Sequence, residues 1–397
     1  MRNVKPRAGG ALLGIAACVV LGASLLAVAV SKVVSSSASG PTDVGLGWQA
    51  AARPPGAAAL ARPVALGSGL VVFTSDGSAE VIGVVSASAW SSSDGSNWSR
   101  LSQPGAIAEP GRSITIVAAC PDRHGGLVVT GTSAIGSDPS LALRATIWHS
   151  PDGRTWDLAA VDGDIGASLE DVAAGPGGLV AVGLAQPFSG GGARALAWYS
   201  SDGETWRSAT VGDSDGYSLL AVTAWQGEFV ALGSGTGGRA AAWTSADGGA
   251  WTQMASLPDG FEADRLVAFA DRIVAVGSAA GMPESLTSSD ARTWARAAMP
   301  LDETQGQANA LVADAVEVNG SLVAVGYSAI GVIPEATSVP PPRPLVWVSG
   351  DGLNWRLLPP DTSLTGSLDG AAVLGSNVVV TTQDSADPPI YVGTPAG

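Results

Sequence analysis

The side chains best suited to ligand chemistry are arginines that recur at one position of a repeated pattern. Each lies four residues before the tryptophan that opens a copy of the pattern. The four residues are Arg144, Arg194, Arg239 and Arg343. If the copies fold alike, these guanidinium groups form a partial ring on one face, where they would bind a carboxylate in bidentate fashion. The alternative is structural, because repeat copies share framework residues and these arginines would then pair with acids of neighbouring copies.

Acidic residues gather in the connections that we expect between copies of the pattern. Two carboxylates across a cleft are the machinery of glycoside hydrolysis, and several together bind Ca²⁺. Their Asp-x-Asp pairs lack the spacing of a calcium loop, so solvated turns are the other interpretation. The residues concerned are Asp162, Asp164, Glu170, Asp171, Asp213, Asp215, Asp259, Glu262, Asp264, Asp302 and Glu303.

Two tyrosines, Tyr217 and Tyr327, are expected near the same face and complete the candidate ligand-binding residues. His124 and His149 are the only histidines, which excludes a His-rich metal cluster, and both are expected to be ordinary surface residues. The sequence has no P-loop, dinucleotide fingerprint, G-x-S-x-G elbow or C-x-x-C pair. We therefore expect no metal and no cofactor, and the catalytic residues, if there are any, stay unassigned.

The elements that must position these side chains follow from the pattern W-x-S-x-D-G-x-x-W, which occurs six times. The fifth copy has Leu286 for the first Trp and Ala291 for the Gly. The aspartates, spaced 43 to 61 residues apart, are Asp94, Asp152, Asp202, Asp247, Asp290 and Asp351, and the closing tryptophans are Trp98, Trp156, Trp206, Trp251, Trp294 and Trp355. Periods of this length are typical of β-propeller blades, each a four-stranded sheet.

The residue types of the pattern predict a tight turn between the third and fourth strands of a blade. Ser and Asp side chains accept hydrogen bonds from nearby backbone N–H groups, and Gly permits a positive φ. The two tryptophans bury apolar area on either side of the turn. The most conspicuous motif is therefore structural rather than catalytic.

The two ends of the chain predict the number of blades. After the sixth copy, residues 367–381 repeat the first two strands and residues 389–393 read as a third, without a fourth. Near the other end, residues 47–50 resemble the start of a fourth strand. We expect this N-terminal strand to complete the last blade, which gives an all-β, seven-bladed propeller over residues 47–397.

The six segments resemble Asp-boxes, also called BNR repeats, which occur in sialidases, sortilin-type receptors, some glycoside hydrolases and photosystem assembly factors. Their usual form is S-x-D-x-G-x-T-W, whereas Asp and Gly are adjacent here, as in Asp152-Gly153. The resemblance implies a sialidase-like or sortilin-like propeller with the boxes on peripheral turns. A sialidase would use a Tyr activated by Glu, for which Glu335 is the loop acid nearest to Tyr327, but the F/Y-R-I-P motif is absent.

The N-terminus predicts export to the outside of the cell. Arg2, Lys5 and Arg7 precede an uncharged, mostly apolar run over residues 8–30, long enough to span a bilayer as a helix. We rank an uncleaved signal-anchor over residues 1–30 first, a cleaved signal peptide second, and lipidation at Cys18 in a bacterial lipobox-like segment third. Residues 31–46, rich in Ser and Gly, read as a flexible tether.

Composition limits the partners. Beyond Lys32 the chain has 16 Arg and 35 acidic residues, a formal charge of −19, so nucleic-acid binding is disfavoured. Cys120, the only cysteine outside the apolar run, is expected to be a buried hydrophobe without a disulfide.

The sequence leads to two hypotheses for function. The first is an exported, membrane-tethered monomeric propeller that binds an unidentified protein or glycan without catalysis. The second is a glycoside hydrolase of the exo-sialidase type. An assembly factor for a membrane complex is a third possibility, because a fold does not by itself fix an activity.

Overall fold

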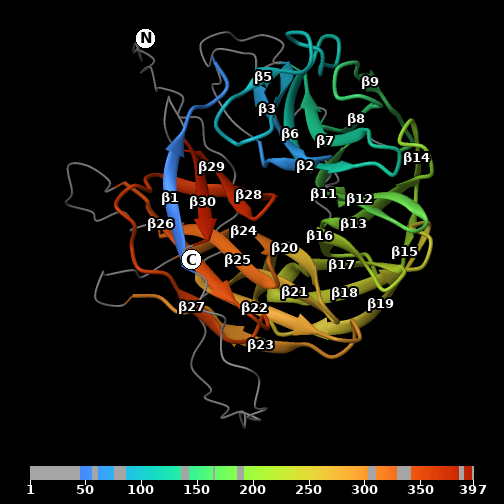
Figure 1. The fold of residues 1–397 in the computed structure, drawn as a ribbon. Helices are drawn as coiled ribbons and strands as arrows, with labels where there is room; N and C mark the ends of the chain where they lie inside the picture. Colours follow the sequence, from blue (N-terminus) through green and yellow to red (C-terminus); the bar gives the residue numbers. More distant parts are fainter. Residues whose placement is uncertain are drawn as a thin grey trace, which may run out of the picture. The chain divides into compact units, whose positions relative to one another are not determined.

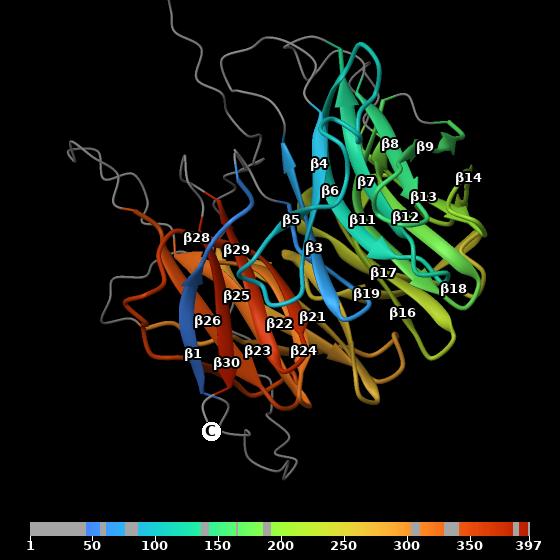
Figure 2. The ribbon, with the colours of Figure 1, turned by 45° about the horizontal axis from the view of Figure 1, so that its top comes forward.

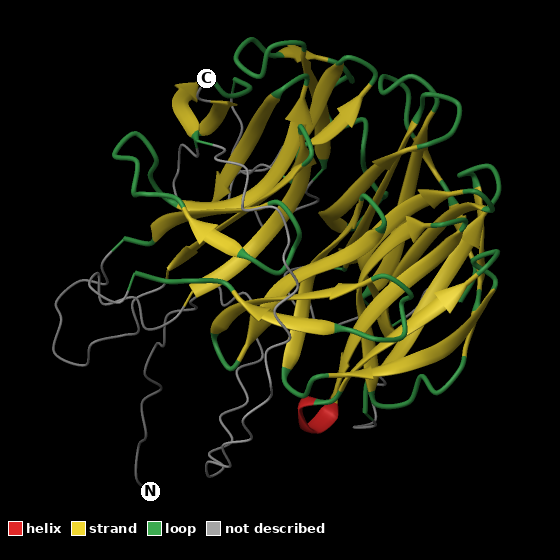
Figure 3. Ribbon diagram, turned by 60° about the horizontal axis from the view of Figure 1, so that its bottom comes forward, coloured by secondary structure: helices red, strands yellow, loops and turns green. Residues whose placement is uncertain are grey.

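The computed structural model describes residues 45–55, 61–75, 86–135, 143–163, 166–185, 192–302, 310–328, 341–383 and 389–395. Contacts divide the chain into residues 1–39 and 40–397, and all the described residues belong to the second unit. That unit is all-β: among the described residues the helical structure is one short 3₁₀ turn, η1 (Thr236–Gly238) (Figure 3).

The strands form seven antiparallel sheets, which are the blades of a propeller (Figure 1). Blade 1 contains β2 (Val64–Leu66), β3 (Gly69–Ser75), β4 (Ala87–Ser92) and β5 (Ser99–Arg100). Blade 2 contains β6 (Ser113–Pro121), β7 (Leu127–Ala134), β8 (Arg144–Ser150) and β9 (Asp157–Leu158). Blade 3 contains β11 (Ala167–Gly175), β12 (Gly178–Ala185), β13 (Arg194–Ser200) and β14 (Thr205–Ser208), with β10 (Ala160–Val161) added parallel to β14.

The remaining blades repeat this order. Blade 4 contains β16 (Tyr217–Trp225), β17 (Glu228–Gly235), β18 (Ala240–Ser245) and β19 (Ala250–Leu257), with β15 (Thr210–Val211) added parallel to β19. Blade 5 contains β20 (Phe261–Phe269), β21 (Arg272–Ala279), β22 (Met282–Ser288) and β23 (Ala295–Ala298). Blade 6 contains β24 (Ala310–Val318), β25 (Ser321–Ser328), β26 (Arg343–Ser349) and β27 (Trp355–Leu357). Blade 7 contains β28 (Ser367–Leu374), β29 (Asn377–Gln383), β30 (Ile390–Pro395) and β1 (Leu46–Ala51).

The blades close into a ring through strands from opposite ends of the chain. The innermost strands contact one another in the order β2, β6, β11, β16, β20, β24, β28 and back to β2. The N-terminal β1 pairs antiparallel with β30, so that Trp48 lies opposite Gly393 (Figure 2). The predicted seven blades and the predicted closure by an N-terminal strand are confirmed.

Each S-x-D-G turn is held by hydrogen bonds from its own backbone. In blade 3, the hydroxyl of Ser200 accepts from the N–H of Gly203 at 2.8 Å and donates to Asp202 at 3.0 Å. Asp202 also accepts from the N–H of Thr205 at 2.9 Å. In blade 5 the N–H groups of Thr293 and then Arg292 lower the pKa of Asp290 to about 2. The carboxylates therefore act as fixed acceptors that set the turn geometry.

The glycines of these turns pack against the preceding blade. A Cβ added at Gly248 of blade 4 would lie 2.5 Å from Cγ2 of Val180 in blade 3, and one at Gly352 of blade 6 would lie 2.6 Å from Val274 in blade 5. Their φ angles are 81° and 74°. Glycine is thus required twice, for its backbone conformation and for the space it leaves between blades. Ala291, which replaces glycine in the fifth copy, keeps a positive φ of 56°.

The two tryptophans of each motif fasten different segments. In four blades the indole N–H of the first Trp donates to the connection that enters the blade: Trp148 to Ala108 at 3.0 Å, Trp198 to Asp162 at 2.9 Å, Trp243 to Gly212 at 2.8 Å and Trp347 to Pro300 at 2.7 Å. In five motifs the second Trp donates to its own turn, as from Trp206 to the carbonyl of Gly203 at 2.9 Å. In the first motif Trp98 donates instead to the carbonyl of Ala52 at 2.8 Å. In blade 7 Tyr391 takes the place of the first Trp and accepts from the N–H of Thr365 at 2.9 Å.

The predictions for Cys120 and for the two histidines have different outcomes. Cys120 is buried as expected, and His124 is exposed as expected. His149, expected at the surface, is only 9% exposed, because the turn of blade 3 packs on it and Asp122 binds its Nε2 at 3.0 Å.

The N-terminal predictions fall mostly outside the described residues. The expected helix of residues 1–30 and residues 31–44 of the expected tether lie there, and β1 begins at Leu46. Within the described ranges, no helix has the length and apolar character needed to cross a bilayer.

We predict that Gly352→Ala lowers the free energy of unfolding by about 2–4 kcal/mol, the sum of the backbone strain and the clash with Val274. The matched control is Gly320→Ala in the same blade, where φ is 75° and no atom lies within 4 Å of the added Cβ. There we expect a loss of about 1 kcal/mol from strain alone. Denaturant unfolding measures both, and equal losses would contradict the packing explanation.

Candidate functional site

The four predicted arginines occupy equivalent positions, as the repeat implies. Arg144, Arg194 and Arg343 begin β8, β13 and β26, and Arg239 immediately precedes β18. They belong to blades 2, 3, 6 and 4.

Arg144 is part of a local ion-pair network. Its Nη1 lies 3.1 Å from Oε1 of Glu109, a side chain that is only 6% exposed. Arg112 contacts the same oxygen at 3.5 Å, and the hydroxyl of Thr146 donates to Oε2 at 3.3 Å. This geometry favours the structural interpretation of Arg144, with Glu109 as the partner from the preceding connection.

Arg239 lies over the ring of Tyr217 while its own side chain remains exposed. Its guanidinium carbon lies 4.5 Å from the centre of the Tyr217 ring, and its Nε donates to the carbonyl of Thr236 at 3.3 Å. Tyr217 itself is 7% exposed and meets Trp243 edge-on at 5.1 Å. The arginine and the tyrosine therefore stabilise each other by a cation–π contact.

The other predicted residues lie apart. Arg194 forms an antiparallel bridge with Asp215 through the backbone. Tyr327, on β25, pairs across strands with Leu311 and with Pro344. Arg343 follows Pro342 at the start of β26 and lines a groove between blades 6 and 7.

Four acids that we expected in connections lie in innermost strands. Glu170 and Asp171 belong to β11, and Glu262 and Asp264 belong to β20. The register shifts between Leu169 and Asp171, and between Ala263 and Arg265, so Glu170 and Asp264 are the extra residues of β-bulges. A bulge turns two successive side chains toward different neighbours, which simple alternation does not reveal. Of the other acids, Asp164 and Glu303 lie outside the described residues.

The residues after these bulges form an ion triad at the centre of the ring. Arg265 lies 3.4 Å from Asp171 and 3.3 Å from Asp314, its neighbours from blades 3 and 6. Asp171 also accepts from the N–H groups of Val172 and Val222, at 2.9 and 3.0 Å.

Asp314 is held in the same way. It accepts from the N–H of Ala315 at 2.8 Å and of Ala371 in the next blade at 2.9 Å. Both aspartates of the triad thus join a blade to its neighbour. Burial raises the pKa of Asp171, although the charge of Arg265 opposes that shift.

The bulge residues form a second group, the central acid cluster, made of Glu170, Asp264 and Asp369 with Arg62. Burial raises the pKa of Glu170 and raises that of Asp264 to about 7, while the charge of Arg62 lowers both. The charges of Glu262, Asp314 and Asp369 add to the increase at Asp264. Arg62 precedes blade 1, its Nη2 donates to the carbonyl of Ala313 in blade 6 at 3.0 Å, and its charge acts on the bulges of blades 3 and 5. Arg62 therefore reaches across the centre of the ring.

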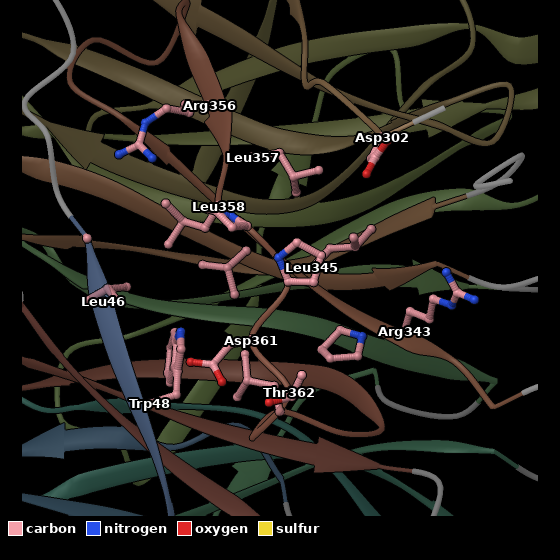
Figure 4. Close-up of a pocket in the computed structure, with 16 residues that line it drawn as sticks. Leu46, Trp48, Asp302, Arg343, Leu345, Arg356, Leu357, Leu358, Asp361 and Thr362 are labelled. Atoms are coloured by element: carbon pink, nitrogen blue, oxygen red, sulfur yellow. The ribbon is translucent and has the colours of Figure 1, made fainter. Parts of the chain in front are cut away.

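A groove of about 660 Å³ lies at the seam between blades 6 and 7. Figure 4 shows Leu345 and Leu358 in its middle, Trp48 of β1 on one side and Arg343 on the other. Asp361 lies beside Trp48. The walls are mainly apolar, with charged residues at the rim, which is the character of a binding site for an apolar group.

No candidate metal centre emerges: the described part of the chain has no group of three or more His, Cys, Asp or Glu residues able to hold an ion. The residues that the sequence analysis missed are Arg62, Arg265, Asp314 and Asp369. The sequence did contain a sign of them. Each is a charged residue in the mainly apolar first strand of a blade, or in the segment that leads into that strand.

The sequence matches no protein-family model and no curated protein. Among solved structures, the chain is similar to a Trypanosoma rangeli sialidase in complex with sialic acid, with 12% identity, 85% of this chain and 54% of that chain covered, and a TM-score of 0.48. It is also similar to an α-L-arabinofuranosidase from Fusarium graminearum in complex with an iminosugar inhibitor, with 12% identity, 71% and 93% covered, and a TM-score of 0.45.

A third similar structure is a lectin of Aleuria aurantia in complex with α-methyl-L-fucoside, with 11% identity, 77% and 95% covered, and a TM-score of 0.44. The neighbours thus include glycoside hydrolases and a glycan-binding propeller. At these identities and TM-scores the similarities carry no argument about this chain.

We predict that Asp264→Asn stabilises the protein at pH 8 and changes little at pH 4. A carboxyl pKa raised from 3.8 to about 7 means that the folded state holds the proton more tightly than the unfolded chain, so this group destabilises the fold as pH rises between those values. The gain at pH 8 should be about 2–4 kcal/mol. Thermal unfolding at both pH values measures it, with the exposed Asp259→Asn as control, and a gain that is the same at both pH values would contradict the assignment.

Proposed function

We propose that this protein is an exported, membrane-tethered β-propeller that binds a protein or a glycan without catalysing a reaction. The observation that carries the proposal is the use of the central carboxylates as structural links. Asp171 and Asp314 are each engaged by two backbone N–H groups and by Arg265. A general acid or base needs a free oxygen within reach of substrate, and these carboxylates are committed to the framework.

The candidate ligand-binding residues support the same proposal. Arg144 is paired with Glu109 and Arg239 covers Tyr217, so the tyrosine is not placed to attack a sugar. Arg194, Arg239 and Arg343 are exposed on the side of the strand 2–3 connections, and these are the arginines of the set that we assign to ligand contact. The export and the tether rest on the basic and apolar N-terminal pattern and on the acidic remainder of the chain.

The six turns support membership of the sialidase-like or sortilin-like superfamily through their likeness to Asp-boxes. That likeness concerns structural residues. The turns join the third and fourth strands of a blade and pack between blades, whereas the central carboxylates lie on first strands.

A glycoside hydrolase is the second candidate, and one observation favours it. Asp264 has a pKa of about 7 and shares the centre of the ring with Glu170. A carboxylic acid that is protonated near neutral pH is what a glycosidase needs as its general acid. In this second candidate a pair of carboxyl groups, and not the tyrosine of the sialidase mechanism, would carry out the hydrolysis.

A panel of chromogenic glycosides that includes a sialoside and an α-L-arabinofuranoside separates the two candidates. We predict no turnover above the buffer rate for the wild type, for Asp264→Asn or for Arg194→Ala. Turnover by the wild type that falls at least a hundredfold in Asp264→Asn but persists in Asp259→Asn would replace binding by catalysis. The same panel at pH 5 and pH 8 covers the mainly protonated and the mainly ionised states of Asp264.

A further inference from the structure

The β-bulges of the first strands define one level at the centre of the ring. In each of blades 2 to 7 the register of the first strand shifts at a single residue, and all six of these residues are half-buried. They are Val117, Glu170, Leu220, Asp264, Ala313 and Asp369. In blades 3 to 7 the bulge lies five residues before the end of the strand, so these bulges face the centre at a common height.

Blade 1 contributes a cation to this level instead of a bulge. Its first strand, β2, has only three residues and pairs with β3 without a register shift. Arg62 lies two residues before β2, and its Nη2 donates to the carbonyl of Ala313, the bulge of blade 6, at 3.0 Å. A Cβ added at Gly370, which follows the bulge of blade 7, would lie 2.9 Å from Cα of Arg62. Both contacts place Arg62 at the level of the bulges.

The two arginines at the centre are held differently. Arg265 lies 3.4 Å from Asp171 and 3.3 Å from Asp314, and both aspartates also bind backbone N–H groups. Arg62 makes its one hydrogen bond to a carbonyl, and no carboxylate in the described part of the chain lies within ion-pair distance of it. Because a guanidinium group has five N–H donors, Arg62 is bound to the framework much less firmly than Arg265.

Arg62 supplies the positive charge for the carboxyl groups at its level. Its charge opposes the rise that burial causes in the pKa of Glu170 and of Asp264. Arg265 is already paired with the two aspartates of the triad. Without Arg62, the acids Glu170, Asp264 and Asp369 would share the bulge level with no cation, and their mutual repulsion would favour the uptake of a replacement.

We propose that Arg62 is an autoinhibitory plug, a built-in guanidinium that occupies a cation site at the centre of the ring and keeps outside cations from its three carboxyl groups. The class of ligand kept out presents a guanidinium group, because the group already in the site is a guanidinium. Such a group can donate planar N–H bonds to the carbonyl of Ala313 and to carboxylates at the same time.

This inference goes beyond the proposed function, because it concerns what occupies the centre of the ring. It holds for a binding propeller and for a hydrolase alike. The site also differs in charge from the exposed arginines assigned to ligand contact, since it accepts a cation.

The test compares the full-length wild type with full-length Arg62→Ala and uses methylguanidinium chloride as the probe. Titration calorimetry should show saturable binding by the variant, and at least tenfold weaker binding by the wild type, whose site is occupied. The melting temperature of the variant should rise saturably with the probe up to about 20 mM, because a ligand that binds the folded state stabilises it. Tetramethylammonium chloride has the same charge without an N–H, so it controls for ionic strength and should give neither effect.

Two further substitutions at the same position separate charge from shape. Arg62→Lys keeps a cation at the centre, so probe binding should stay at least tenfold weaker than in Arg62→Ala. Arg62→Gln removes the charge but keeps most of the side-chain length, so it should bind the probe, and it replaces Arg62→Ala if that variant does not fold. Arg154→Ala, which removes an exposed arginine from the turn of blade 2, is the matched surface control and should behave as the wild type does.

Three results overturn the inference: no binding of the probe by the neutral variants, equal binding by the wild type and Arg62→Ala, or equal binding by Arg62→Lys and Arg62→Gln. Equal stabilisation by tetramethylammonium would show ionic screening in place of a site and would overturn it too. All of these leave the proposed function standing, because the glycoside panel tests that separately. Conversely, glycoside turnover would overturn the non-catalytic function and leave a measured guanidinium site intact.

Discussion

The structure depends on the contact between each S-x-D-G turn and the preceding blade. The turn is rigid because a serine hydroxyl and an aspartate carboxylate bind its backbone N–H groups. Rigidity alone would not hold one sheet against another. The glycine of the turn makes the close contact between sheets possible. It lets the turn approach Val180, Val274 or His149 more closely than a residue with a Cβ could. These contacts join neighbouring sheets at the rim of the ring.

At the centre of the ring the links are ionic. Asp171 joins blades 3 and 4, Asp314 joins blades 6 and 7, and Arg265 joins the two aspartates. A buried ion set of this kind gives specificity of arrangement more than net stability. It also divides the central side chains into framework residues and the central acid cluster, in which burial raises the pKa of Asp264 to about 7.

Much of the fold could be predicted from the sequence, because its repeat makes the local chemistry visible six times. The seven blades, the turn geometry and the strand β1 that completes blade 7 all follow from the spacing of Trp, Asp and Gly. The positions of Glu170 and Asp264 did not follow, because a bulge breaks the alternation that places side chains. The partners Glu109 of Arg144 and Asp122 of His149 were also missed, since contacts between connections and strands leave no periodic signal.

A double-mutant cycle on Gly248 and Val180 tests the interblade contact most directly. In the wild type, Gly248→Ala should lower the free energy of unfolding by about 2–4 kcal/mol, because its Cβ would lie 2.5 Å from Val180. In a Val180→Ala background the clash is removed, and the same substitution should cost about 1 kcal/mol. An equal cost in both backgrounds would contradict the claim that the turns hold the blades together by this close approach.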